Sequence, residues 1–322
     1  MTPINRVLKE KNTTIKPIWI MRQAGRYLPE FRDIRKLNTD FIKLCLNSKL
    51  AKEITLQPLK RFDLDAAIIF SDILMLPYAL NQKVEFKKNF GPILGELDLD
   101  DILNVNEDEF VQKIYPVYDA INMVSNDNLT KNKSTIGFVG APWTLLVYML
   151  NKQSPKLGLK KDFFENKSLI KKLLIIIEKF LKIHIKYQIE NGANVIQIFD
   201  SWAGLVEEKD LQNYIYNPTL NLVKGVGQGL ANFLPVNQRA IAENIGGNMG
   251  IAVDDVGRIV NTGNYQDPDN IMAGYNLNML TDKSFDDRIS NISETLVNSG
   301  EITILPASSL EISKRSLMIR SK

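Results

Sequence analysis

The chain has 322 residues, enough for one large domain or two medium ones. Its hydrophobic fraction of 44% and charged fraction of 24% are ordinary for a folded globular protein, so disorder is excluded as the main state. Lys and Arg number 40 and Asp and Glu number 37, so the net charge is only +3, without the large basic surplus of a dedicated nucleic-acid binder.

The chain holds one cysteine, Cys45, and one histidine, His184. They exclude an intrachain disulfide and fall short of the four Cys/His ligands of a structural zinc site, so we expect no metal. The polar start, residues 1–16, does not look like a secretory leader, and the longest apolar run, residues 143–150, is too short to cross a bilayer. We therefore expect a cytoplasmic protein that does not bind membranes.

The first half of the chain alternates between helical and strand patterns. Residues 48–62 have apolar positions at helical spacing, with Ser48 as the expected N-cap, and residues 66–70 form a short apolar run typical of a buried strand. A second helix is predicted over residues 107–124 and a second strand over residues 134–140.

The alternation continues in the second half. A long helix is predicted over residues 167–190, ending at Asn191-Gly192, and a strand over residues 195–199. Weaker patterns predict strands over 231–236, 249–253 and 301–305 and a helix over 284–298. This alternation favours an α/β fold with a parallel sheet, and we predict a single-domain (β/α)8 TIM barrel spanning residues 1–322; a doubly wound open sheet is the alternative.

Polar residues recur where the predicted strands end. Asp72 and Ser201 follow their strands closely, and Tyr148 lies beyond the strand at 134–140. In a barrel such ends meet on one face, where catalytic residues lie. The alternatives are structural: Asp72 as the cap of a following helix, and Tyr148 as a core residue packed with Trp143 and Leu146.

A second candidate segment, residues 17–32, carries Arg22 and Arg26 around Gln-Ala-Gly. An arginine remains charged and offers a planar fork of donors that suits carboxylates or phosphates, and Gly25 lets the backbone bend or approach a ligand. The apolar residues 18–21 should be buried and draw Arg22 partly inward, although a solvated basic surface is the simpler interpretation.

Two long motifs resemble those of a known family. The run MRQAGRYLPEFR at 21–32 is similar to the signature of the uroporphyrinogen decarboxylases, and GFVGAPWTLLVYML at 137–150 is similar to that family's second conserved block. The segments IIFSDIL at 68–74 and IQIFDSWAG at 196–204 fit the same pattern in order and spacing, so the resemblance covers residues 1–235.

The resemblance implies a (β/α)8 barrel, a homodimer, and cofactor-independent conversion of uroporphyrinogen to coproporphyrinogen by decarboxylation of acetate side chains. It implies a substrate site lined by Arg22, Gln23, Ala24, Gly25 and Arg26 and completed by Asp72, Tyr148 and Ser201. Asp72 would stabilise a cationic ring, while Arg22 and Arg26 bind carboxylates and one of them relays a proton.

The resemblance weakens toward the end of the chain. Ala307 stands where the family has a substrate-contacting histidine, and His184 lies within a predicted helix as a packed or half-exposed residue. A catalytically impaired tetrapyrrole-binding relic is therefore the alternative to an active decarboxylase. The related cobalamin-dependent methyltransferases bind zinc through His and Cys, for which this chain lacks ligands, and Gly225-Val-Gly-Gln-Gly does not follow a predicted strand as a dinucleotide loop would.

Overall fold

A computed structural model describes residues 1–10, 16–87, 90–156, 158–233, 302–303 and 320–321. At the centre of these residues lies a three-stranded parallel sheet in the order β1-β4-β5, formed by Ala66–Ile68, Ser134–Gly140 and Val195–Phe199. The strands are short and apolar, as expected for a sheet with helices on its faces. The structure thus establishes an α/β fold with parallel strands.

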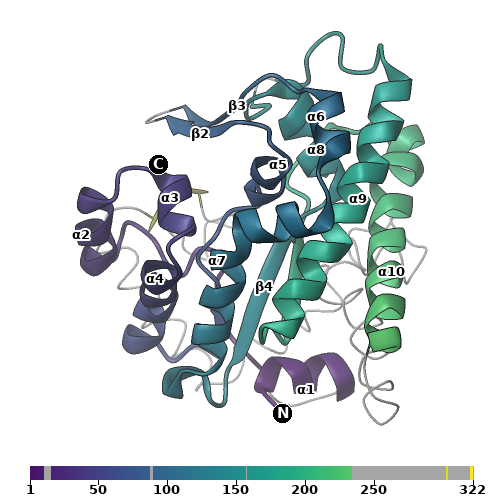
Figure 1. The fold of residues 1–322 in the computed structure, drawn as a ribbon. Coiled ribbons are helices and arrows are strands. Elements are labelled where there is room, and N and C mark those ends of the chain that lie inside the picture. Colours follow the sequence, from purple (N-terminus) through teal and green to yellow (C-terminus); the bar gives the residue numbers. More distant parts are fainter. Residues whose placement is uncertain (11–15, 88–89, 157, 234–301, 304–319, 322) are drawn as a thin grey trace, which may run out of the picture.

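Four helices precede or flank the first strand: α1 (Pro3–Glu10), α2 (Pro29–Leu37), α3 (Phe41–Cys45) and α4 (Ser48–Arg61). In Figure 1, α1 lies near the start of β4, and α2, α3 and α4 form a group on the other side of the molecule from α10. Helix α4 confirms the helix predicted at 48–62, but its N-cap is Asn47, whose side chain accepts the Leu50 N–H at 3.1 Å.

The segment between β1 and β4 adds helices and a hairpin: α5 (Met75–Ala79), β2 (Val84–Lys87), β3 (Gly91–Leu94), α6 (Leu99–Asn104), α7 (Glu107–Ser125) and η1 (Asn128–Thr130). Strands β2 and β3 pair antiparallel, away from the parallel sheet (Figure 1). Helix α7 confirms the helix predicted at 107–124; Asn106 and Glu109 form a capping box at its start.

The remaining elements are α8 (Pro142–Asn151), α9 (Lys167–Glu190), η2 (Ala203–Leu205), η3 (Glu208–Asp210), the π-helical turn η4 (Gln212–Tyr216), α10 (Asn217–Phe233), β6 (Ile302–Thr303) and β7 (Arg320–Ser321). Helix α9 confirms the prediction at 167–190. The predicted strand at 231–236 is wrong over 231–233, because α10 continues through Phe233. Residues 302–303 are extended but pair antiparallel with 320–321. The predictions at 249–253 and 284–298 and at Ala307 lie outside the described residues.

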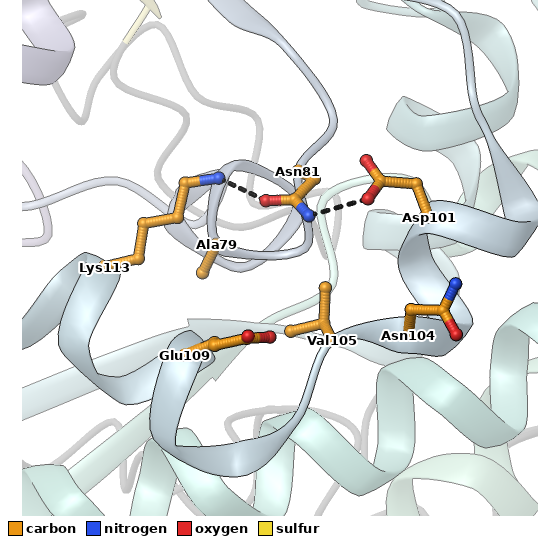
Figure 2. Close-up of a pocket in the computed structure, with 7 residues that line it drawn as sticks. All are labelled: Ala79, Asn81, Asp101, Asn104, Val105, Glu109 and Lys113. Carbon is orange, nitrogen blue, oxygen red and sulfur yellow. Dashed lines mark hydrogen bonds between the residues drawn. The ribbon is translucent and has the colours of Figure 1, made fainter.

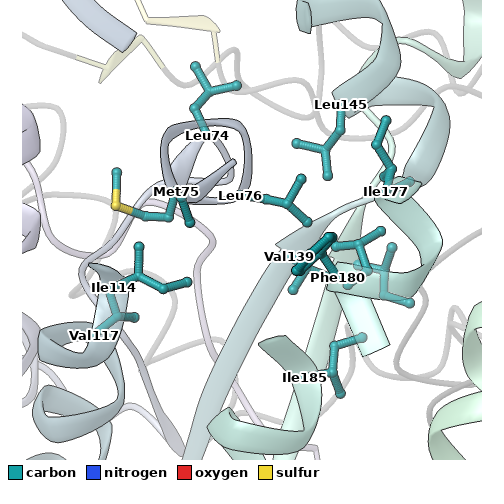
Figure 3. Close-up of a cluster of buried hydrophobic side chains, with 14 of the residues drawn as sticks. Leu74, Met75, Leu76, Ile114, Val117, Val139, Leu145, Ile177, Phe180 and Ile185 are labelled. Carbon is teal, nitrogen blue, oxygen red and sulfur yellow. The ribbon is translucent and has the colours of Figure 1, made fainter. Parts of the chain in front are cut away.

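The largest core cluster joins the sheet to the helices around it. Figure 3 shows Leu76 of α5, Val139 of β4, Leu145 of α8 and Phe180 of α9 gathered together, with Ile114 of α7 beside Met75 on the other side of α5. Burial of such side chains stabilises the fold by about 1.5–3 kcal/mol each. Among the described residues, no helix is both long and apolar enough to cross a membrane.

Gly140 shows how this core shapes the edge of the sheet. A Cβ at this position would lie 3.0 Å from Leu145 and 3.2 Å from the Cβ of Ile73. Glycine therefore lets α8 begin directly after β4, with Ala141 bonded through its N–H to the Phe199 carbonyl at 2.8 Å. The start of α8 is thus fixed to the C-terminal end of β5.

Candidate active site

The C-terminal edge of the parallel sheet holds three of the predicted site residues. Asp72 lies in the segment between β1 and α5, Tyr148 on α8 after β4, and Ser201 directly beyond β5. Because β1, β4 and β5 are neighbours and run parallel, these segments all leave the sheet at the same edge.

Asp72 is half-buried, and one of its carboxylate oxygens, Oδ1, accepts the Leu74 N–H at 2.8 Å. Its carbonyl accepts the Met75 N–H at 3.2 Å, so Asp72 orders the turn before α5. The alternative that Asp72 caps this helix is wrong, because the N-cap is Leu74 and no side chain caps α5. Burial raises the pKa of Asp72 to about 6, against the lowering effects of the Leu74 hydrogen bond and of the Arg22 charge. The structure therefore brings Arg22 within electrostatic reach of Asp72.

The two arginines lie on an exposed segment. Met21 is 52% exposed and Arg22 and Arg26 are exposed, so the expectation that the apolar run 18–21 draws Arg22 inward is wrong. Ile18 is buried in that run, where its N–H bonds to the Asp65 carboxylate at 2.6 Å. The arginines are therefore free to face a ligand from solvent without the cost of burying a charge.

Gln23, between the arginines, is bound to the protein. Its side-chain Nε2 donates to the Ala66 carbonyl at 2.9 Å, its Oε1 accepts the Ile20 N–H at 3.3 Å, and its carbonyl accepts the Tyr27 hydroxyl. The side chain is only 2% exposed. Gln23 thus anchors the arginine segment to the start of β1.

Ala24 and Gly25 are half-buried in the same segment. Gly25 does not adopt the left-handed conformation, and a Cβ there would meet Tyr27 at 3.5 Å, an ordinary contact. The fold therefore does not require glycine at this position.

Tyr148 is half-buried, and its ring packs edge-to-face on Trp202 with centroids 6.1 Å apart. The pKa of Tyr148 is raised, chiefly by burial and further by the charge of Asp72, while Trp202, Ser154 and the charge of Arg22 oppose the rise. The charges of Arg22 and Asp72 therefore both reach Tyr148. Ser201 is exposed and directly precedes Trp202 in the chain.

Asp200, directly after the strand predicted at 195–199, was not among the expected site residues, yet its carboxyl group is a second one buried at this edge. Burial raises its pKa to about 6, opposed by hydrogen bonding from Thr144, whose hydroxyl donates to Asp200 Oδ1 at 2.7 Å. An acidic residue directly after a buried strand was the available sequence signal, but the partner on α8 is 56 residues away.

A separate pocket of about 350 Å³ lies between α5, α6 and α7 (Figure 2). Asn81, at φ 67°, links its walls: it donates to Asp101 at 3.0 Å and accepts from Lys113 Nζ at 2.6 Å. The pocket lining contains none of the predicted site residues. Because these polar groups satisfy one another, we assign the pocket no function.

His184 is a packed residue of a helix, which is one of the two possibilities that the sequence left open. It is 4% exposed on α9, and its Nδ1 lies 2.9 Å from the Tyr118 hydroxyl. Within the described part of the chain, no three His, Cys, Asp or Glu side chains gather as a metal-binding group.

Comparison with known proteins agrees with the motifs in this site. Residues 1–256 match the family described as Uroporphyrinogen decarboxylase (URO-D). Proteins named uroporphyrinogen decarboxylase from Rickettsia bellii, Agrobacterium fabrum and Campylobacter jejuni are 43%, 39% and 41% identical to 70%, 68% and 66% of this chain. The matches span 66%, 64% and 64% of those relatives, just under two thirds of their length.

A solved structure, a methyltransferase from Methanosarcina mazei, resembles the fold with a TM-score of 0.55 and 16% identity over 70% of this chain and 66% of that protein. At this identity the likeness concerns the fold alone. The family match, by contrast, covers Arg22, Arg26 and Asp72. It also covers α8, the helix that carries Tyr148. The chain therefore belongs to the uroporphyrinogen decarboxylase family.

Proposed function

We propose that this protein decarboxylates the acetate side chains of uroporphyrinogen III to give coproporphyrinogen III in haem and tetrapyrrole biosynthesis, without a cofactor. The names of the relatives support the reaction. The observation that carries it to this chain is that Asp72 and Tyr148 follow neighbouring parallel strands at one edge of the sheet, where the charge of Arg22 reaches both of them.

The substrate can supply its own electron sink. A proton added to a pyrrole carbon makes the ring a cation, which accepts the electron pair of the breaking bond as carbon dioxide leaves. The resulting exocyclic methylene takes a second proton and becomes a methyl group, and the ring carbon returns its added proton. The net change consumes one proton and one carboxylate and releases carbon dioxide, so no redox or carbonyl cofactor is needed.

The site residues have complementary roles in this proposal. Ionised Asp72 accepts the pyrrole N–H groups and stabilises the ring cation; a preorganised charge of this kind accelerates a reaction by about 10²- to 10³-fold. Arg22 and Arg26 bind substrate carboxylates and orient the ring, and one of them relays a proton. Tyr148 and Ser201 hydrogen-bond a further carboxylate, while Gln23, Ala24 and Gly25 shape the segment that lies against the substrate.

Asp72 is suited to this task because its site is poorly solvated without being closed. Burial opposes ionisation, and its pKa of about 6 still leaves the carboxylate ionised at neutral pH. Pyrrole N–H donors would stabilise the ionised form further. The same burial keeps the effective dielectric constant low and so strengthens the interaction with the ring cation.

The proposal extends to architecture. The parallel order β1-β4-β5 with intervening helices is consistent with part of a (β/α)8 barrel, and we infer that residues 1–322 form one such domain. By analogy with the family, we infer a cytoplasmic homodimer. Sedimentation at micromolar concentration tests the dimer, because finding only monomer at that concentration would contradict the inference.

Anaerobic supply of uroporphyrinogen III, with products separated by their number of carboxylates, tests the activity. We expect coproporphyrinogen and its partly decarboxylated precursors without added metal. Intact substrate with measurable binding would instead indicate a tetrapyrrole-binding protein without catalysis, and neither binding nor turnover would remove the proposal altogether.

A further inference from the structure

Asp200 connects the end of β5 to the first turn of α8. Its Oδ1 accepts the Thr144 hydroxyl at 2.7 Å, and Thr144 Oγ1 in turn accepts the Trp202 N–H at 3.1 Å. Thr144 is in the first turn of α8, whose N-cap Ala141 offers no side-chain acceptor. A carboxylate is favourable at this end of a helix because of the helix dipole.

The hydrogen bonds between the end of β5 and α8 hold Asp200 and Trp202, the two neighbours of Ser201 in the chain. Asp200 is bound through its side chain, and Trp202 through its N–H to Thr144 and through its carbonyl to the Trp143 indole Nε1 at 2.9 Å. The Trp202 ring then lies against Tyr148, further along α8. Ser201 and Tyr148 are therefore fixed relative to each other, although no direct bond joins them in this arrangement.

Joining the loop after β5 to α8 through a buried carboxylate costs free energy of folding. The second oxygen of Asp200, Oδ2, is buried and has no hydrogen-bond partner among the described residues. A neutral side chain could accept the Thr144 hydroxyl without burying a charge. Buried carboxyl groups that lack a full set of partners are concentrated at functional sites, where the local arrangement serves more than stability.

We propose that Asp200 is a positioning residue that acts through Thr144 to hold the Ser201–Trp202 segment against α8, so that Ser201 and Tyr148 together bind one substrate carboxylate. The proposal rests on the proposed function, because it assigns a role toward the tetrapyrrole. It makes Asp200 a supporting group rather than one that contacts the substrate.

Two substitutions of Thr144 test the connection, with uroporphyrinogen III as the substrate. Thr144→Val keeps the shape but removes the hydroxyl, and should raise KM about tenfold while kcat changes less than about threefold. Thr144→Ser restores the hydroxyl and should return KM to within about twofold of the wild-type value. Asp200→Asn retains one acceptor oxygen and should raise KM less than Asp200→Ala does.

Thr130→Val is the matched control, because Thr130 is also buried and its hydroxyl bonds to the Val124 carbonyl at 2.6 Å, in a different part of the fold. It should lower stability and leave KM unchanged. Hydrogen exchange of the Trp202 amide supplies a readout independent of turnover, with protection expected to fall in Thr144→Val and return in Thr144→Ser.

The possible outcomes separate the two proposals. An active wild-type protein whose KM is unaffected by Thr144→Val, or is not restored by Thr144→Ser, overturns the positioning role alone. If Thr144→Val does not fold, Asp200→Asn and Asp200→Ala decide the question by the same KM comparison. A wild-type protein that neither binds nor converts uroporphyrinogen overturns the function and, with it, this role, even if the Trp202 amide behaves as expected.

Discussion

Two regions of the molecule bury ionisable side chains, and they differ in how completely those groups are partnered. Between α7 and α9, His184 is paired with Tyr118 at 2.9 Å and packed beside Phe110, and burial lowers its pKa to about 3. At the C-terminal edge of the sheet, burial instead raises the pKa of Asp72 and of Asp200 to about 6.

The charge states differ accordingly. His184 is neutral throughout the physiological range, so its burial carries no cost above the pKa of an unfolded histidine. Asp72 and Asp200 are largely ionised at neutral pH in surroundings that disfavour their charge. The helix interface therefore buries a neutral group that packs well, whereas the strand edge buries two carboxyl groups, one of which, Asp200, has an oxygen without a hydrogen-bond partner among the described residues. Donors from a ligand at the strand edge are what the proposed function would add.

The largest effect that the comparison predicts is on catalysis at the strand edge. Asp72→Asn keeps an acceptor for the Leu74 N–H but removes the charge, and should lower kcat by about 10²- to 10³-fold. Steady-state decarboxylation measures this, with circular dichroism to verify folding. Asp100→Asn, an exposed substitution on α6, is the control and should leave kcat unchanged. Near-normal turnover by Asp72→Asn would remove Asp72 from its role.

A second prediction concerns the same substitution, which should raise stability although it lowers kcat. The folded pKa of Asp72, about 6, exceeds its ordinary value of 3.8, so the folded state binds the proton more tightly and loses stability as pH rises through this window. At pH 7.5, Asp72→Asn should therefore be more stable than wild type by about 2–3 kcal/mol, a difference that falls by more than half at pH 4.5. Urea unfolding at the two pH values measures it; a difference independent of pH would contradict the buried-charge explanation.

The same contrast separates what sequence could predict from what it could not. The helix interface follows from local periodicity: the spacing of apolar residues over 107–124 and 167–190 predicts α7 and α9, which the structure confirms. Helix α10 was missed because its glycines look like a loop. Glycines lower helix propensity, and Gly225 lies where α10 packs on α9, beside the flexible end of Lys182.

At the strand edge, sequence predicted the positions of Asp72 and Ser201 but not their partners. Gln23 was expected in the substrate site, yet its side chain is engaged by Ala66, 43 residues away. The Asp200–Thr144 bond joins residues 56 apart. Such contacts depend on the parallel pairing of β1, β4 and β5, which local patterns do not encode, so they appear only once the strands are placed side by side.

The smallest predicted effect tests the helix interface. Tyr118→Phe removes the hydroxyl that meets His184 Nδ1 and leaves a buried ring nitrogen without its partner, so it should lower the free energy of unfolding by about 1–2 kcal/mol. Decarboxylation per folded molecule should be unchanged, because neither residue is among those assigned to the substrate site. Tyr115→Phe is the matched control, since Tyr115 is on the same helix but 47% exposed, and should change stability by less than about 0.5 kcal/mol. A loss of turnover in Tyr118→Phe without a loss of stability would reverse the comparison, because the paired region would then be serving the reaction.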